Sequence, residues 1–217
     1  MPNRRILSLG AGVQSTTVYL LALDGKIPPI DAAVFADTQE EPEAVYRHLE
    51  WLHTVGGPPI YVRTAGKLGD DLRNGMNFTG QRFVSIPAYT APPGVRPATG
   101  IVRRQCTQEY KIRIVERTIR RDILSLKPRA RWPKDRPVVQ LFGISADEAR
   151  RAVRIKAQFH GTRTANFPLL DLGWTRQDCL RYLADRVPHP VPRSACVFCP
   201  FKSDTEWWLL KQTDHAG

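Results

Sequence analysis

The 217-residue sequence has no apolar run of the roughly 18 residues that a membrane-spanning helix needs, so we do not expect the chain to be an integral membrane protein. The stretch before Gly10 is too short for a signal peptide, and we therefore expect a cytoplasmic protein. Cysteine is scarce, at four residues. In a reducing compartment so few thiols favour metal or redox chemistry over a disulfide framework. No internal repeat or low-complexity tract is present.

Hydrophobic residues make up 42% of the chain and charged residues 24%, which is enough apolar surface for a folded core. Apolar segments typical of strands alternate with segments typical of helices. We expect strands at residues 4–10, 30–36, 59–63 and 137–144, and helices at 15–23, 41–54, 107–126, 147–158 and 175–186. This alternation predicts an α/β fold with a parallel sheet.

The domain organisation predicted from the sequence is an α/β domain over residues 1–170, followed by a helical extension over 171–217 that carries two cysteines. Residues 64–100 are rich in glycine and proline, which predicts a long loop or lid. The extension ends with a helix that contains Trp207 and Trp208. These side chains either stack on bases or pack the helix onto the domain.

The segment Ser-Leu-Gly-Ala-Gly-Val-Gln-Ser-Thr, residues 8–16, joins the first strand to the first helix. Glycines at positions 10 and 12 bring backbone N–H groups close to an anion, and Ser15 and Thr16 add hydroxyl donors at the positive end of the helix. The segment lacks the Gly-Lys-Ser/Thr of a Walker A loop and the third glycine of a dinucleotide fingerprint. It predicts a phosphate-binding turn of another kind, or else a plain strand-to-helix turn.

Two further segments end predicted strands and carry carboxylates. Asp37 follows the second strand, and Gly143, Asp147 and Arg151 lie where the fourth strand gives way to a helix. Ligands of open α/β sheets bind at such strand ends, so these residues are candidates for a nucleotide and Mg²⁺. A helix-capping role is the alternative for both segments.

The four cysteines fall into three groups. Cys196 and Cys199 form a Cys-x-x-Cys pair, which lets two sulfurs converge on one metal ion. Cys106 lies close in sequence to Arg103, Arg104 and Lys111, and this positive charge favours a thiolate. Cys179 is either a fourth ligand or a buried core thiol. Three alternatives follow for these cysteines: an iron–sulfur cluster of the [4Fe-4S] type, a zinc ion, or a metal-free pair that carries a persulfide.

The basic charge is concentrated in the middle of the chain. Residues 101–163 contain 17 Lys and Arg against 6 Asp and Glu, which accounts for the whole net charge of +11. A concentrated excess of this kind is typical of a surface for polyanions and predicts a nucleic-acid partner, tRNA or DNA. The alternative is a solvated basic face with no partner.

The segments 10–16, 36–38, 106–111, 143–151, 174–183 and 194–201 together resemble the phosphoadenosine-phosphosulfate reductase-like branch of the adenine-nucleotide α-hydrolase superfamily, the PP-loop ATP pyrophosphatases. The sequence departs from the usual Ser-Gly-Gly-x-Asp-Ser loop at Gly10 and Gln14. The resemblance implies an open, doubly wound, three-layer α/β/α fold with five parallel strands. It also implies that ATP is cleaved between its α- and β-phosphates.

From the motifs and the resemblance together we expect three sets of site residues. The catalytic set is Cys106, Lys111, Arg104 and Ser15. The set that binds ATP and Mg²⁺ is Ser8, Gly10, Gly12, Gln14, Ser15, Thr16, Asp37, Gly143, Asp147 and Arg151. The candidate metal ligands are Cys106, Cys179, Cys196 and Cys199.

The function that we expect is an ATP-dependent sulfurtransferase that adenylates and thiolates a nucleic acid, supplied by a sulfur donor or a reductant protein. One alternative is a sulfonucleotide reductase. The reductases carry a catalytic cysteine near their C-terminus, and no cysteine follows Cys199, so this alternative implies a truncated chain. The other is a metal-stapled nucleic-acid-binding protein on a degenerate nucleotide fold.

Overall fold

The computed structural model describes residues 3–77, 79–81, 86–94, 100–102 and 104–213. Their contacts divide the chain into two compact units whose segments alternate along the sequence. Unit 1 comprises residues 1–35, 44–62 and 117–194, and unit 2 comprises residues 36–43, 63–116 and 195–217. No helix in the described part of the chain is long and apolar enough to cross a membrane.

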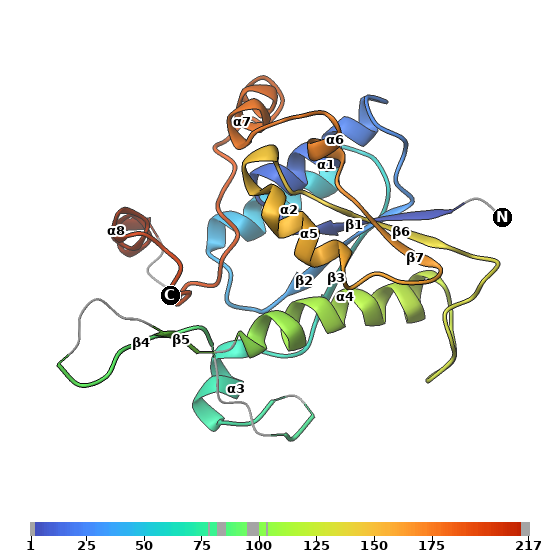
Figure 1. Cartoon of the computed structure of the whole chain (residues 1–217). Coiled ribbons are helices and arrows are strands. Elements are labelled where there is room, and N and C mark those ends of the chain that lie inside the picture. Colours follow the sequence, from blue (N-terminus) through green and yellow to red (C-terminus); the bar gives the residue numbers. More distant parts are fainter. Residues whose placement is uncertain (1–2, 78, 82–85, 95–99, 103, 214–217) are drawn as a thin grey trace. The chain divides into compact units, whose positions relative to one another are not determined.

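A five-stranded parallel sheet forms the centre of the fold, in the order β3-β2-β1-β6-β7 (Figure 1). The strands are β1 (Arg4–Leu9), β2 (Ala32–Asp37), β3 (Ile60–Thr64), β6 (Val138–Phe142) and β7 (Arg163–Asn166). Because β1 pairs with β2 on one side and β6 on the other, the strand order reverses between β1 and β6. Ligands of such sheets bind outside the carboxyl ends of the strands at this point.

Helices flank the sheet, in agreement with a three-layer α/β/α arrangement. In unit 1 they are α1 (Val13–Leu23), α2 (Glu43–Thr54), η3 (Ala146–Glu148), α5 (Ala149–Lys156), α6 (Pro168–Asp171) and α7 (Arg176–Ala184). Unit 2 contains α3 (Leu68–Asn74), η1 (Thr107–Ile112), α8 (Asp204–Thr213) and a hairpin of β4 (Tyr89–Thr90) and β5 (Gly100–Ile101). The α/β class and the parallel sheet predicted from the sequence are confirmed.

The basic helix predicted over 107–126 is one continuous helical segment: η1, α4 (Arg113–Thr118) and η2 (Ile119–Ile123). η1 and η2 are π-helical, as shown by the bonds from the N–H of Arg113 to the carbonyl of Gln108 and from Leu124 to Ile119. Such widened turns are frequent at functional sites. The first of them begins directly after Cys106.

The core of unit 1 lies between the sheet and helices α1, α2 and α7. Alternation along β1 turns Leu7 and Leu9 onto the same face of the sheet, where they join this core. Strand β2, which lies inside the sheet between β3 and β1, is buried at residues 32–36, as its continuous apolar run predicts. A smaller cluster around Ile144 is formed by Ala152 and Phe167 and supports the start of α5.

Candidate functional site

The glycine loop of unit 1 gathers backbone donors on one point. The N–H groups of Gly10 and Gly12 lie 3.1 and 3.3 Å from the Oγ atom of Ser15 and donate to it. Gly12 is the N-cap of α1, so the point lies at the positive end of that helix. A phosphate oxygen would need the same donors. The hydroxyl of Ser15 therefore occupies the position in which the loop is suited to hold an anion.

Backbone packing against β6 shapes this loop. A Cβ atom on Gly143 would lie 2.6 Å from the backbone N of Ser15 and 2.7 Å from the carbonyl carbon of Gln14, so only glycine fits there. Within the loop, Ala11 is fully buried and has a left-handed φ of 54°, which is a strained conformation for a residue with a side chain. The loop is thus held in place by its surroundings.

Gln14 links the loop to two other segments of unit 1. Its Nε2 atom donates to Oε2 of Glu148 at 3.2 Å and to Oγ of Ser145 at 3.4 Å, and its Oε1 atom accepts from Nη1 of Arg176 at 3.1 Å. An amide can bridge a carboxylate and a guanidinium because it both donates and accepts. An aspartate at this position would meet the like charge of Glu148. Gln14, where the sequence departs from the usual loop, is therefore matched to its neighbours Glu148 and Arg176.

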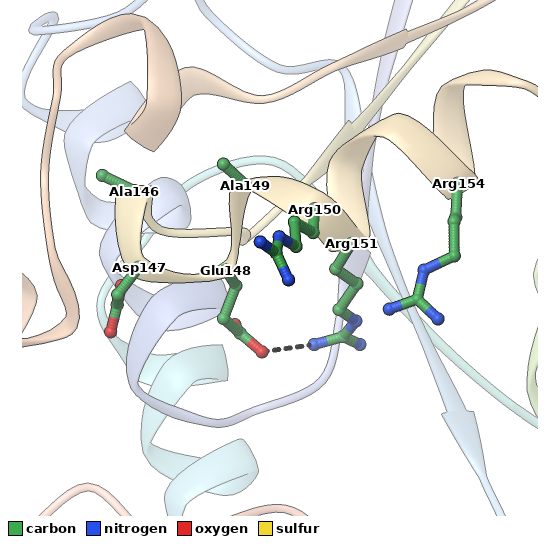
Figure 2. A pocket seen from close by; sticks show the side chains of 7 residues that line it. All are labelled: Ala146, Asp147, Glu148, Ala149, Arg150, Arg151 and Arg154. Atoms are coloured by element: carbon green, nitrogen blue, oxygen red, sulfur yellow. Dashed lines mark hydrogen bonds and ion pairs between the residues drawn. The ribbon is translucent and has the colours of Figure 1, made fainter.

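An open pocket lies over η3 and the start of α5 (Figure 2). Asp147 and Glu148 stand at one end, and Arg150, Arg151 and Arg154 project from the helix. Arg151 pairs with Glu148 at 3.2 Å. Hydrogen bonds lower the pKa of Asp147, foremost that with the Ser145 side chain, so its carboxylate stays ionised. The pocket offers positive charge to phosphates and carboxylates to a divalent cation.

Two residues of unit 1 that were expected to bind the nucleotide, Ser8 and Thr16, have hydrogen-bond partners within the protein. Oγ of Ser8 accepts from Nε2 of Gln140 at 2.8 Å, and Oε1 of buried Gln140 has no hydrogen-bond partner among the described residues. Thr16 is fully buried, and its hydroxyl lies 2.9 Å from Nε2 of His48. Sequence reasoning missed His48, although the signal was present. It is a polar residue at a core position of α2, between Val45 and Leu52.

Unit 2 contains three of the four cysteines. Cys196 and Cys199 lie in one tight turn, in which the N–H of Cys199 donates to the carbonyl of Cys196 at 2.9 Å. Cys106 directly precedes η1. Its pKa is raised by the charge of Cys199, and its own charge raises the pKa of Cys196. Oγ1 of Thr38 lies 3.2 Å from Sγ of Cys196. Asp37, next to Thr38, accepts from the N–H of Gln39 at 2.8 Å and so closes a turn.

Burial outweighs positive charge at these thiols. It raises the pKa of Cys106 and raises that of Cys196 to about 11, although Lys111 lowers both. The expectation of a thiolate at Cys106 is therefore wrong for the free thiol. The cations have other partners: Nζ of Lys111 lies 3.1 Å from the buried carboxylate of Glu41, and Arg104 lies over the ring of Phe201. Arg103, the third expected cation, lies outside the described residues.

Cys179 belongs to unit 1. It lies on α7, has no exposed surface and is part of the hydrophobic core, where burial raises its pKa to about 11. Within the described part of the chain, no group of three or more His, Cys, Asp or Glu side chains is arranged to hold a metal ion. Cys106, Cys196 and Cys199 are thus neighbouring thiols without a preformed metal geometry.

Aromatic rings organise part of the basic segment in unit 1. The guanidinium carbons of Arg120 and Arg163 lie 5.0 and 4.6 Å from the ring centroid of Trp132, and that of Arg163 also lies 4.9 Å from Phe159. Such stacking orders guanidinium groups while they keep their charge. In unit 2, Trp208 on α8 is 62% exposed.

Gly143→Ala is expected to lower the free energy of unfolding by about 1–3 kcal/mol, because the new Cβ atom would overlap the loop backbone. Denaturant unfolding measures this loss. Gly10→Ala is the matched control, since its Cβ atom would meet nothing nearer than Oγ of Ser15 at 3.7 Å. Equal losses in the two variants would contradict the close approach at Gly143.

Alkylation of Cys196 is expected to be slow at pH 8, where a thiol with a pKa of about 11 is only about 0.1% ionised, and to speed up about tenfold per pH unit up to that pKa. Lys111 lowers this pKa and Glu41 raises it. In chelator-treated protein, Lys111→Gln should therefore slow the reaction and Glu41→Gln should accelerate it. Mass spectrometry of iodoacetamide adducts measures the rates, and effects of the same sign would refute the assignment.

No protein-family model matches the sequence, and no curated protein matches it either. The resemblance to the phosphoadenosine-phosphosulfate reductase-like branch therefore rests on the residues of the chain itself. The observed order of strands and the gathering of donors at the glycine loop agree with an open α/β sheet that binds its ligand at the switch point.

Proposed function

We propose that the protein is a cytoplasmic, ATP-dependent sulfurtransferase of the PP-loop type that adenylates and thiolates a nucleic acid. The glycine loop supports nucleotide binding, because the N–H groups of Gly10 and Gly12 converge on one point. The observation that carries the sulfur-transfer part is the set of neighbouring thiols of Cys106, Cys196 and Cys199 in unit 2. Nucleotide binding alone would not need them.

In the proposed first step, the phosphates of ATP take over the donors that Ser15 now engages, and the Ser15 hydroxyl turns to donate to a phosphate oxygen. Arg151 and its neighbours supply positive charge, and Asp147 is an ionised carboxylate suited to Mg²⁺. A substrate oxygen attacks the α-phosphorus of ATP, and the bond between the α-phosphorus and the oxygen that bridges to the β-phosphate breaks. Pyrophosphate leaves, and the substrate is adenylated.

In the proposed second step, a sulfur donor first leaves a persulfide on one cysteine of unit 2. The terminal sulfur attacks the adenylated atom, and AMP leaves. A second cysteine then attacks the remaining sulfur–sulfur bond, which releases the thiolated product and leaves a disulfide for an external reductant. Positive charge beside Cys196 would come from Lys111, which lowers the pKa of this thiol, whereas Glu41, the partner of Lys111, raises it.

A metal centre does not enter these steps. The described cysteines do not form a ready metal site, so an iron–sulfur cluster or zinc stays a prediction, with Cys106, Cys196 and Cys199 as its ligands. A bound metal would hold the sulfurs as thiolates in spite of their burial. The persulfide route needs only the thiols that are present.

Ser15→Ala is expected to abolish pyrophosphate and AMP release from ATP in the presence of Mg²⁺ and nucleic acid, because the hydroxyl at the convergence of the loop is lost. A coupled pyrophosphate assay measures this, with Ser125→Ala, an exposed serine of unit 1, as control. Sulfite release without nucleic acid would instead indicate a sulfonucleotide reductase. Nucleotide binding without pyrophosphate release would indicate a binding protein.

Binding to nucleic acid is expected to weaken steeply with salt, by about 10³-fold or more between 50 and 200 mM if six or more phosphates are contacted. Arg163→Gln should weaken binding and reduce the slope of log K against log salt by about one, because it removes a guanidinium ordered by Trp132. Arg181→Ala, an exposed arginine outside the basic segment, is the control. An affinity independent of salt would remove the nucleic-acid part of the proposal.

A further inference from the structure

A buried histidine lies beneath the glycine loop of unit 1. His48 on α2 has no exposed surface, yet both of its ring nitrogens have polar partners. Nε2 lies 2.9 Å from Oγ1 of Thr16, and Nδ1 lies 2.9 Å from Nε2 of His189. The ring also stacks on Trp51, with centroids 5.4 Å apart. The chain Thr16–His48–His189 thus connects the first turn of α1 to a partly exposed imidazole.

The burial of His48 fixes its charge. Burial, and then the charge of His189, lower the pKa of His48 to about 4, so the ring is neutral near pH 7. A neutral imidazole has one N–H group and one acceptor nitrogen. Each of its two hydrogen bonds needs one donor, so only two arrangements of the chain exist. Either Thr16 donates to His48, which donates to His189, or all donors are reversed.

The hydrogen-bonding role of Nε2 of His189 selects between these arrangements. Where that nitrogen carries a proton, it donates to Nδ1 of His48. His48 must then donate to Thr16, whose own proton turns to another acceptor. Both bonds survive, but the hydroxyl of Thr16 changes from donor to acceptor towards His48. The donor or acceptor role of a partly exposed side chain thereby determines the role of the Thr16 hydroxyl in the loop.

The segment that carries His189 also touches the loop directly. His189 lies between Pro188 and Pro190, which restrict its backbone. Further along, the backbone O of Pro192 and N of Ser194 lie 3.8 and 3.7 Å from the position of a Cβ atom on Gly12. The segment therefore holds the loop at Gly12 by packing and at Thr16 by hydrogen bonds. An apolar residue at position 48 would keep the packing of α2 and lose only the second contact.

We propose that His48 is a positioning residue of the glycine loop, which orients the Thr16 hydroxyl and connects it to His189. This inference rests on the proposed nucleotide binding of that loop. Two amide substitutions separate the two halves of the chain. In His48→Gln the amide reaches the place of Nε2 and retains a partner for Thr16. In His48→Asn the amide reaches the place of Nδ1 and retains a partner for His189 only.

The affinity for Mg²⁺-ATP, measured by calorimetry, should fall about five- to tenfold in His48→Asn and change less than twofold in His48→Gln. His53→Gln, an exposed histidine of the same helix, is the control. Unfolding midpoints of all three variants show whether the fold is retained. Equal affinities in the folded His48→Asn and His48→Gln variants would overturn the inference, as would Thr16→Val binding ATP like the wild type.

A nucleotide-free measurement separates this inference from the proposed function. In the uniformly ¹⁵N-labelled full chain, His48 should show one protonated and one bare ring nitrogen from pH 5 to 8, and His189→Gln should shift the amide signals of Gly12 and Ser15. His48→Gln should remove that shift. If ATP does not bind the wild type, the proposed function fails. If the amide signals of Gly12 and Ser15 do not respond to the change at His189, the inference fails, whether or not ATP binds.

Discussion

The close packing of two backbones is the constraint on which unit 1 depends. Gly143 directly follows β6 and packs against the peptide between Gln14 and Ser15, and this contact sets where the loop can turn. With that turn fixed, the N–H groups of Gly10 and Gly12 point to one place. Gln14 can then reach Ser145 and Glu148 on the segment that follows Gly143. The loop and the pocket over α5 are therefore two parts of one rigid corner of the sheet.

Unit 2 shows a competition between burial and charge. Lys111 and Arg104 give the region around Cys106 its basic sequence, but Glu41 and Phe201 engage them. The thiols are left in surroundings that disfavour the thiolate. A site of this kind stays protected from adventitious oxidation until a substrate, a donor or a metal changes the local charge.

The sequence was sufficient for features that depend on neighbours along the chain. The apolar runs of β1, β2 and β6 and the glycines of the loop predicted the sheet and its turn, and five parallel strands were implied by resemblance. β7 escaped prediction from the residues because it is a polar edge strand, Arg-Thr-Ala-Asn, without an apolar run. The pKa of Cys196 depends on the carboxylate of Glu41, far away in sequence, and no local pattern contains that information.

The alternation of segments has a consequence for the chain as a polymer. The backbone passes between the two units five times, at residues 35/36, 43/44, 62/63, 116/117 and 194/195. Neither unit is therefore a contiguous stretch that a gene fragment could encode, and one proteolytic cut at any of the three inner crossings leaves each unit with pieces from both products. Circular permutation at such a crossing would keep every segment, whereas truncation at one of the three inner crossings would remove parts of both units.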